Sequence, residues 1–320
     1  DFEDVKGQEN IKRALEIAAA GSHNAIMVGP PGAGKTMLAK RIPSILPPLS
    51  LSEALETTKI HSVGGKMKQG ESLKAVRPFI SPHHTISDVA MVGGGQFPQP
   101  GAISLAHNGV LFLDELPEFK RTVLEVLRQP LEDRQVTISR SKFTVDYPAS
   151  LMLIASMNPC QCGYFNHPEK DCVCSPGHVS KYWNRISGPL LDRIDIHMEV
   201  VPVPFKELSQ SRKAEPSKAI RKRVNIARAR QEKRFKHQQG IYSNSQMHTR
   251  QIRDICQIDQ AGQNLLKNAI EKLGLSARAY DRILKVSRTI ADLEQQERIL
   301  PEHLAEAIQY RTLDRESWNG

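Results

Sequence analysis

The sequence lacks several features that would place it in a specialised class of protein. It has no run approaching the roughly 18 uninterrupted apolar residues that a membrane-spanning helix needs. Its 20 Gly and 20 Pro are too few and too dispersed for a collagen-like or low-complexity chain. The start, Asp-Phe-Glu-Asp, is acidic, has no initiator Met and lacks the apolar region of a secretory signal, so we expect a piece of a longer protein. With only five Cys and no such signal, the sequence predicts a reducing, cytoplasmic location and no membrane partner.

The composition that remains is typical of a soluble globular protein with a sizeable core. The 320 residues suffice for about two domains of roughly 100–200 residues each, and 39% of them are hydrophobic. Lys and Arg exceed Asp and Glu by 44 to 35, which favours an anionic partner, nucleic acid before a membrane surface. From Lys206 to Lys236 there are twelve Lys or Arg against three acids. The alternative interpretation of this run is an ordinary solvated helix face.

Short apolar runs alternate with helical patterns along the first two thirds of the chain. Four runs, Asn24–Val28, Val110–Leu113, Leu151–Ala155 and His197–Val201, are candidate buried strands. This alternation predicts an α/β fold, in which a parallel sheet is covered by helices. Between Gln135 and Tyr147, apolar and polar residues alternate around a basic tip, which predicts a β-hairpin.

A proline-rich stretch, Val201-Pro202-Val203-Pro204, marks the expected domain boundary, because proline disfavours helix and removes a backbone donor. We therefore expect an α/β nucleotide-binding domain over residues 1–204 and a helical domain over residues 205–320. In the second domain Ser276 is a candidate N-cap, followed by an apolar face that includes Tyr280 and Ile283. Pro301 opens a further predicted helix.

A phosphate-binding loop follows the first candidate strand. Its sequence fits G-x-x-x-x-G-K-[ST] in full and comes between a strand and a helix, the context that the motif requires. Backbone amides of such a loop wrap phosphates, Lys35 would bridge the β- and γ-phosphates of ATP, and Thr36 would bind Mg²⁺. The residues that we assign to ATP binding are Gly29, Pro30, Pro31, Gly32, Ala33, Gly34, Lys35 and Thr36.

An acidic pair ends the second candidate strand. Asp114 and Glu115 follow Val110–Leu113, and open α/β sheets bind ligands at the carboxyl ends of their strands. We assign Asp114 to the Mg²⁺ shell with Thr36, and Glu115 to activating the attacking water as a general base. Two acids after a strand more often cap a helix, but together with the phosphate-binding loop they indicate an ATP hydrolase.

Three further residues are candidates for the same site. Asn158 follows the third strand and could orient water or contact the γ-phosphate, although an Asn in this position is more often a turn residue. Arg193 could reach the nucleotide of a neighbouring subunit; the alternative is a local ion pair with Asp195. Arg278 starts a helix and could contact the phosphate from the second domain, a role for which Arg282 competes.

Four of the five cysteines lie within fifteen residues, in the pairs Cys160/Cys162 and Cys172/Cys174. Two close pairs separated by a loop could hold Zn²⁺ with four thiolates. The C-x-C spacing brings the sulfurs closer than the commoner C-x-x-C, and two histidines, His167 and His178, are available as substitutes. Loop thiols without metal and redox pairing are the alternatives, while Cys256 is assigned to the core.

The chain resembles, nearly end to end, the ATPase core of the magnesium-chelatase-like AAA+ proteins of the ComM/YifB group. Asn158, Arg193 and Arg278 then correspond to sensor 1, the arginine finger and sensor 2. The resemblance also implies a P-loop AAA+ module with an all-helical lid, a homo-hexameric ring and an additional upstream domain. The most specific stretches are Ser81-Pro82-His83-His84-Thr85, Val92-Gly93-Gly94-Gly95, Pro100 to Gly109, Leu113 to Phe119, Met157-Asn158-Pro159-Cys160 and Leu275 to Tyr280.

The function that the resemblance implies is that of ComM, a DNA branch-migration helicase of natural transformation acting on single-stranded or branched DNA. In related rings the hairpin and an insert, here Ile60 to Phe79, line the central pore. Five basic residues of this chain are then candidates for the pore: Lys59, Lys66, Lys68, Lys74 and Arg77. We expect Arg140 and Lys142, at the hairpin tip, to grip phosphates, while an exposed hairpin with ordinary surface charges is the alternative. His83 and His84 are interpreted as structural residues.

Two other functions compete with a DNA motor. The first is a protein-remodelling ATPase that resembles the motor subunit of magnesium chelatase, with the same nucleotide site. The second is a nucleotide-switched scaffold with little turnover, against which Glu115 and Asn158 argue. The basic hairpin and the basic run favour DNA over a protein partner.

Overall fold

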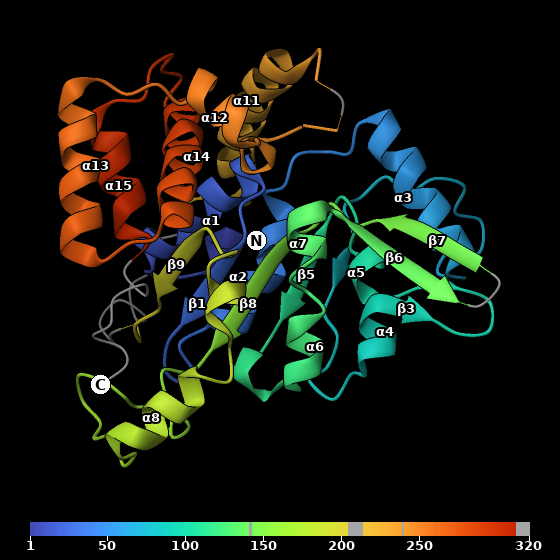
Figure 1. The fold of residues 1–320 in the computed structure, drawn as a ribbon, viewed down its shortest axis with the longest axis horizontal. Helices are drawn as coiled ribbons and strands as arrows, with labels where there is room; N and C mark the ends of the chain where they lie inside the picture. Colours follow the sequence, from blue (N-terminus) through green and yellow to red (C-terminus); the bar gives the residue numbers. More distant parts are fainter. Residues whose placement is uncertain (141–142, 204–213, 239, 312–320) are drawn as a thin grey trace. The chain divides into compact units, whose positions relative to one another are not determined.

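The structure is a computed structural model of the chain, and it describes residues 1–140, 143–203, 214–238 and 240–311 (Figure 1). The chain divides into two compact units. The first unit comprises Asp1–Pro47, Asn158–Ser180 and Ile194–Gly320, and the second comprises Pro48–Met157 and Lys181–Arg193. Lys142 and residues 206–213 of the basic run lie outside the described residues.

The first unit contains the phosphate-binding loop and the C-terminal helices. In it α1 packs against β9 and against α11 and α14. Its elements are η1 (Phe2–Asp4), α1 (Glu9–Gly21), β1 (Ala25–Val28), α2 (Lys35–Arg41), η2 (Ile42–Ser44), β9 (Ile196–Glu199), α11 (Ser217–Phe235), η4 (Asn244–Gln246), α12 (Thr249–Ile255), α13 (Gln260–Leu273), α14 (Ala277–Leu293) and α15 (Pro301–Gln309); α8 (Pro176–Trp183) begins in it.

The second unit contains the acidic pair and the hairpin. In it α5 packs against α3, α4 and the hairpin strand β6. Its elements are α3 (Leu51–Val63), β2 (Phe79–Ile80), α4 (Asp88–Val92), β3 (Gly93–Gly94), β4 (Gln99–Pro100), α5 (Ala102–Leu105), β5 (Val110–Leu113), η3 (Leu116–Glu118), α6 (Arg121–Glu125), α7 (Pro130–Asp133), β6 (Gln135–Arg140), β7 (Phe143–Pro148), β8 (Met152–Met157) and α9 (Gly188–Leu191).

The strands confirm the predicted parallel α/β sheet. β1 pairs in parallel with β9, from Ala25 opposite Ile196, and β5 pairs in parallel with both β2 and β8. The five strands have the order β2-β5-β8-β1-β9. Every residue of β1, β5 and β8 is buried, which is why these strands are continuous apolar runs in the sequence without polar alternation.

The C-terminal part of the described chain is helical, as predicted. Ser276 caps α14 by accepting a hydrogen bond from the Ala279 amide at 3.2 Å. α14 packs against α15, and α15 packs against α13, so the three helices lie side by side (Figure 1). Ile283 is buried on the inner face of α14, but Tyr280 is exposed, so its assignment to that face is wrong. Cys256 is buried, as expected.

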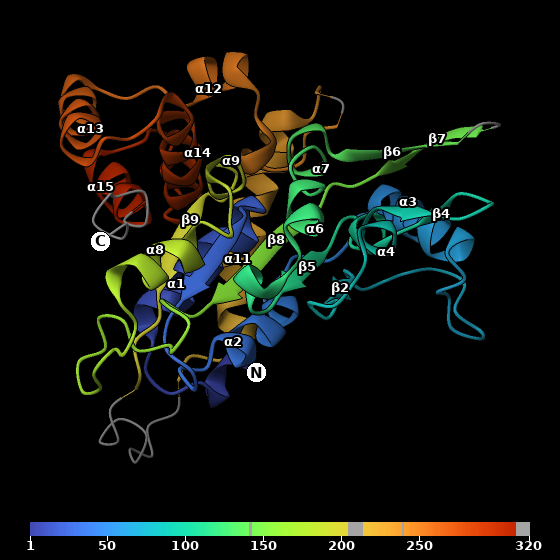
Figure 2. The ribbon, with the colours of Figure 1, turned by 60° about the horizontal axis from the view of Figure 1, so that its bottom comes forward.

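The hairpin forms as predicted, from β6 and β7 (Figure 2). Its strands pair without interruption from Gln135 opposite Pro148 to Arg140 opposite Phe143. Val136, Ile138 and Tyr147 are buried, which accounts for the alternation that predicted the hairpin.

Candidate functional site

The phosphate-binding loop links β1 to α2 in the first unit. Gly34 precedes α2 with a φ of 89°, a left-handed conformation that glycine adopts without a steric penalty. At Gly29 a side chain has no room, because a Cβ there would lie 2.1 Å from the Val200 carbonyl oxygen. The backbone of the loop therefore requires glycine at these positions, independently of any ligand.

Lys35 lies almost buried at the start of α2, with its ammonium group inside the curve of the loop. The Nζ donates to the carbonyl oxygens of Gly29 at 2.6 Å and Pro30 at 2.9 Å, and to the Asn158 Oδ1 at 3.1 Å. Asn158 is the first residue after β8. The structure thus brings together two residues that the sequence analysis assigned to one site from motifs 123 residues apart.

The acidic pair lies in the second unit, at the end of β5. Asp114 accepts a short hydrogen bond from the Ser156 hydroxyl and another from the Glu115 amide at 3.1 Å. Glu115 has a φ of 54°, and its side chain is 58% exposed. These contacts fix the Asp114 carboxylate and leave the Glu115 carboxylate accessible to water.

His84 is a neighbour of Glu115 that the sequence analysis interpreted as structural. Its Nδ1 lies 3.6 Å from the Glu115 Oε2. The His84 ring lies 4.1 Å from the ring of His83 and meets the ring of Phe119 edge-on, which holds the imidazole in place. The only signal in the sequence was that the histidine pair lies in one of the stretches that carry the family resemblance.

Arg193 lies just after α9 in the second unit and is largely buried. Its guanidinium pairs with the carboxylate of Glu132 and donates to the Pro189 carbonyl oxygen at 2.6 Å. Arg193 therefore does engage in a local ion pair, but with Glu132. Asp195, the partner that the alternative interpretation suggested, belongs to a different network in the first unit.

That network includes Arg282, one of the two candidate sensors on α14. Arg282 forms an ion pair with Asp195, whose side chain is 2% exposed. Asp195 also accepts a hydrogen bond from the Asn24 amide at 3.1 Å and lies 3.3 Å from the His23 Nδ1. Burial alone would raise the pKa of Asp195, but Arg282 and His23 outweigh it and hold that pKa well below its usual range. The Arg282 guanidinium is therefore engaged with the buried Asp195 carboxylate.

The four clustered cysteines come together in the first unit. The Cys160 Sγ lies 3.3 Å from the Cys162 Sγ and 3.7 Å from the Cys172 Sγ, and all four sulfurs, with that of Cys174, lie within 4.8 Å of one another. Zinc–sulfur bonds of about 2.3 Å place the sulfurs of a tetrahedral site roughly 3.8 Å apart, so the cluster fits a Zn²⁺ ion. His167, a possible substitute ligand, does not join this cluster: its Nδ1 accepts hydrogen bonds from the amides of Glu169 and Lys170.

A second hairpin, β3–β4, lies against β6–β7 in the second unit. The Tyr147 hydroxyl donates to the Pro98 carbonyl oxygen at 2.8 Å, and a Cβ on Gly93 would lie 2.7 Å from the Ile138 Cδ1. Phe97, in the loop between β3 and β4, is 70% exposed. The sequence analysis did not single out this aromatic residue, because its exposure depends on the hairpin that presents it.

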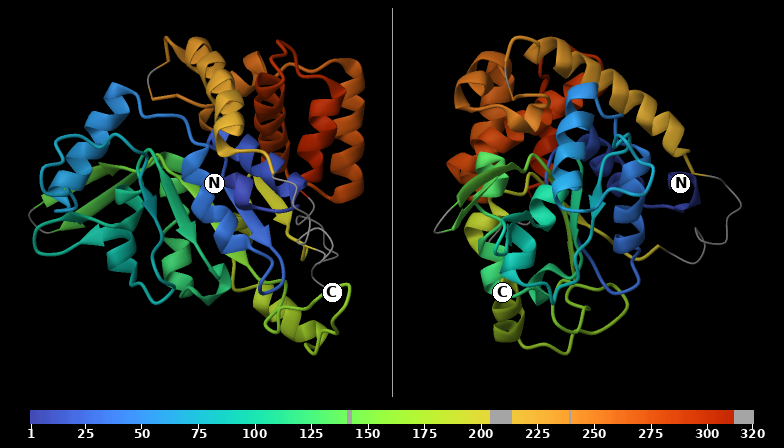
Figure 3. Two further views of the ribbon diagram at one scale, coloured as in Figure 1. Left: turned by 180° about the vertical axis from the view of Figure 1, so that it is seen from behind. Right: turned by 90° about the vertical axis from the view of Figure 1, so that its right-hand side faces the viewer.

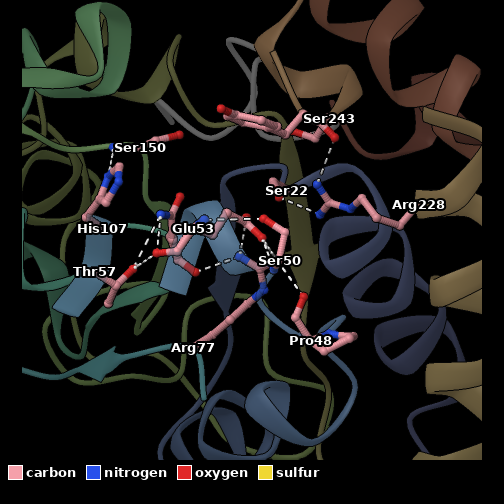
Figure 4. A network of polar contacts seen from close by, with 12 residues as sticks. Ser22, Pro48, Ser50, Glu53, Thr57, Arg77, His107, Ser150, Arg228 and Ser243 are labelled. Carbon is pink, nitrogen blue, oxygen red and sulfur yellow. Dashed lines mark hydrogen bonds and ion pairs between the residues drawn. The ribbon is translucent and has the colours of Figure 1, made fainter. Parts of the chain in front are cut away.

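Part of the basic charge is used inside the protein. Arg77, expected at the pore, pairs with Glu53 at 2.9 Å and donates to the carbonyl oxygens of Pro48 and Asn108, so its guanidinium is engaged within the second unit (Figure 4). Lys74 pairs with Glu71 at 2.7 Å. The remaining three, Lys59, Lys66 and Lys68, are exposed.

The basic run is divided in the same way along α11, the long helix in Figure 3. Arg223 pairs with Glu16, Arg228 donates to the Ser22 hydroxyl at 2.7 Å, and Arg234 pairs with Asp292 at 2.6 Å. These arginines hold α11 to its neighbours, so the run supports nucleic-acid binding less than its net charge suggested. The exposed basic residues of α11 and its end are Lys218, Arg221, Lys222, Lys233 and Lys236.

The chain matches two family models, "Magnesium chelatase, subunit ChlI" over residues 1–208 and "Magnesium chelatase, subunit ChlI C-terminal" over residues 214–311. The protein YifB of Salmonella typhimurium is 48% identical over 98% of this chain and 61% of its own length. The competence protein ComM of Haemophilus influenzae is 45% identical over 98% of this chain and 60% of its own length. The chain thus spans about three-fifths of the length of these relatives.

A more distant relative is the magnesium-chelatase 67 kDa subunit of Heliobacterium mobile, which is 26% identical over 51% of this chain and 28% of its own length. Within the described residues, no helix is both long and apolar enough to cross a bilayer. The cytoplasmic location stays a prediction.

Proposed function

The chain belongs to the magnesium chelatase subunit ChlI family, and from this premise we propose that it is the ATPase part of a ring-forming motor that moves DNA. The similarity to a competence protein supports DNA as the substrate. The observation that carries the proposal is the contact between Lys35 and Asn158. Asn158 directly follows β8, and only three residues separate β8 from the hairpin β6–β7. A change at the nucleotide thus has a short covalent route to a basic hairpin.

In the proposed site each residue has one task. Lys35 and the amides of residues 29–34 hold the phosphates of ATP, and Thr36 and Asp114 supply oxygen ligands for Mg²⁺, which neutralises phosphate charge when bound. Glu115 accepts a proton from the attacking water, and His84 orients its carboxylate. Asn158 contacts the γ-phosphate.

Two arginines complete the proposed site from outside the phosphate-binding loop. Arg193 acts as the arginine finger toward the nucleotide of a neighbouring copy in a homo-hexameric ring. Arg278 acts as the sensor at the start of α14, since Arg282 is committed to Asp195. We keep residues 204 and 205 as the proposed boundary between the α/β domain and the helical lid; that one family model ends at residue 208 and the next begins at residue 214 supports a boundary in this part of the chain.

The proposed DNA contacts combine charge and stacking. Arg140 and Lys142 grip phosphates without reading sequence, as a translocating motor requires. The exposed ring of Phe97, on the neighbouring hairpin, offers a face on which an unpaired base can stack. Basic and aromatic groups are typical of proteins that bind single-stranded DNA, and they support branch migration as the proposed activity.

The decisive experiment measures ATP hydrolysis with and without forked or four-way DNA over a salt series. We expect stimulation by DNA that falls steeply with salt, because contacts to phosphates release counterions. Hydrolysis that ignores DNA would favour a protein-remodelling ATPase, the second candidate, which the match to the 67 kDa chelatase subunit supports. Failure to bind ATP with Mg²⁺ present would refute both.

A structural metal site is the last part of the proposal. Cys160, Cys162, Cys172 and Cys174 hold one Zn²⁺ as four thiolates. Protein purified without chelator is expected to contain about one equivalent of zinc, and less than roughly 0.2 equivalents would refute this site.

A further inference from the structure

The loop that carries the cysteines begins at the nucleotide site. Asn158, which contacts Lys35, is followed by Pro159 and then by Cys160, whose side chain is fully buried. From there to residue 175 the chain forms only bends and turns. The loop therefore has no helix or strand to fix it, and the four sulfurs are its main candidate for a constraint.

The same loop touches the phosphate-binding loop directly. Gly163 closes a turn by donating its amide to the Cys160 carbonyl oxygen at 3.1 Å, with a φ of 88°. A Cβ on Gly163 would lie 2.5 Å from the Cδ and 2.8 Å from the Cγ of Pro31. Backbone of the cysteine loop thus lies against the ring of a residue in the phosphate-binding loop, in the space that any other side chain would fill.

This contact lies beside a small hollow that opens to solvent. Residues of both loops line the hollow: Gly29 and Pro30 of the phosphate-binding loop, and Phe165, Asn166 and His167 of the cysteine loop. The two loops thus border the same hollow, and the close approach of Gly163 to Pro31 joins them beside it.

We infer that the metal held by the four cysteines braces the phosphate-binding loop and thereby sets its affinity for nucleotide. Cys160 and Cys162 come from the start of the cysteine loop, and Cys172 and Cys174 come from its end. A metal ion that joins them closes the loop and removes most of its conformational freedom, which keeps Gly163 against Pro31. Loss of the metal lets the loop open and withdraws this support. The inference rests on the proposed zinc and ATP sites.

The first test measures the Kd for ATP by calorimetry in three states of the same chain: as purified, after zinc has been withdrawn by a chelator, and after zinc has been restored. The chelator itself is removed before each titration, because it would also bind Mg²⁺. We expect the Kd to rise about tenfold on zinc withdrawal and to recover on restoration, since binding would have to reorder the loop. An unchanged Kd after verified loss of zinc would overturn the brace while leaving the metal site and ATP binding intact.

A second test moves the brace without touching the metal. The variant Gly163→Ala places a Cβ against Pro31, and we expect it to retain one equivalent of zinc and to bind ATP about tenfold more weakly. The matched control is Gly70→Ala, because Gly70 has a similar left-handed φ of 79° but a Cβ there would meet nothing within 4 Å. Normal ATP affinity in Gly163→Ala overturns the inference. A chain that binds ATP but never contains zinc refutes the metal site and the brace together.

Discussion

Replacing Arg282 with Met is expected to destabilise the protein without removing its ability to hydrolyse ATP. The substitution leaves Asp195, which is 2% exposed, buried without its guanidinium partner. Breaking a buried ion pair from one side costs roughly 3–5 kcal/mol, and the remaining contacts to Asn24 and His23 point to the lower end, about 3 kcal/mol. At 2–4 °C per kcal/mol for a large domain, the melting temperature should fall by roughly 6–12 °C.

The matched variant is Arg278→Met, one turn earlier on α14. If Arg278 is the sensor, this variant loses ATP hydrolysis at a temperature where it is still folded, whereas Arg282→Met keeps ATP hydrolysis when it is assayed below its unfolding temperature. Calorimetric or fluorescence melting and a coupled ATPase assay on both variants give the comparison. A stable Arg282→Met protein that no longer hydrolyses ATP would refute the assignment and make Arg282 the sensor.

The ion pair between Asp195 and Arg282 also predicts how the stability of the protein depends on pH. The pKa of Asp195 is lowered in the folded protein, so its contribution is fully present above the pKa of the unfolded carboxyl, about 3.9, and is lost as the pH falls below it. The stability gap between the wild type and Arg282→Met should therefore be largest near pH 7 and narrow as the pH falls toward 4, because burial raises the pKa of Asp195 once its guanidinium partner is gone. Burial lowers the pKa of His23 and the charge of Arg282 lowers it further, so below about pH 6.5 His23 weakens the wild type more than Arg282→Met and narrows the gap in the same direction.

Three other substitutions test the proposed motor. Arg193→Ala should keep the Kd for ATP and reduce turnover by about 10³–10⁵-fold, as loss of an arginine finger does; unchanged turnover would refute its role. His84→Gln should lower kcat by roughly tenfold with little change in KM, because it removes the group beside Glu115, and a kcat equal to the wild type would return His84 to a structural role. Phe97→Ala should weaken binding of single-stranded DNA by about 1–3 kcal/mol in an anisotropy titration, whereas Phe97→Tyr should not; equal losses would argue against stacking.

The sequence allowed the sheet and the phosphate-binding loop to be predicted because both depend on local patterns. Strands buried on both faces are continuous apolar runs, so β1 and β5 could be located within a residue or two. The loop could be located because its glycines and Lys35 have a fixed spacing. Asn158 was found in the same way, from its place after a strand.

The contacts that refine the site could not be predicted, because they join residues far apart in the chain. The ion pair between Asp195 and Arg282 spans 87 residues, and that between Arg77 and Glu53 spans 24. In each case a charged residue that the sequence analysis considered for ligand binding forms an ion pair within the protein instead. Net charge along a segment gives no information on which side chains are already paired, so the basic residues of the insert and of α11 were overcounted.

The unbroken pairing of β6 with β7 has a mechanical consequence. Its six consecutive residue pairs make the two-stranded hairpin about 20 Å long, at roughly 3.3 Å per residue. If a hairpin of this length tilts by about 10° at its base, its tip moves by about 3.5 Å. That displacement is close to the 3.4 Å rise between successive nucleotides of a DNA strand. If the protein moves DNA as proposed above, a small rotation of the hairpin would suffice to advance a strand by one nucleotide.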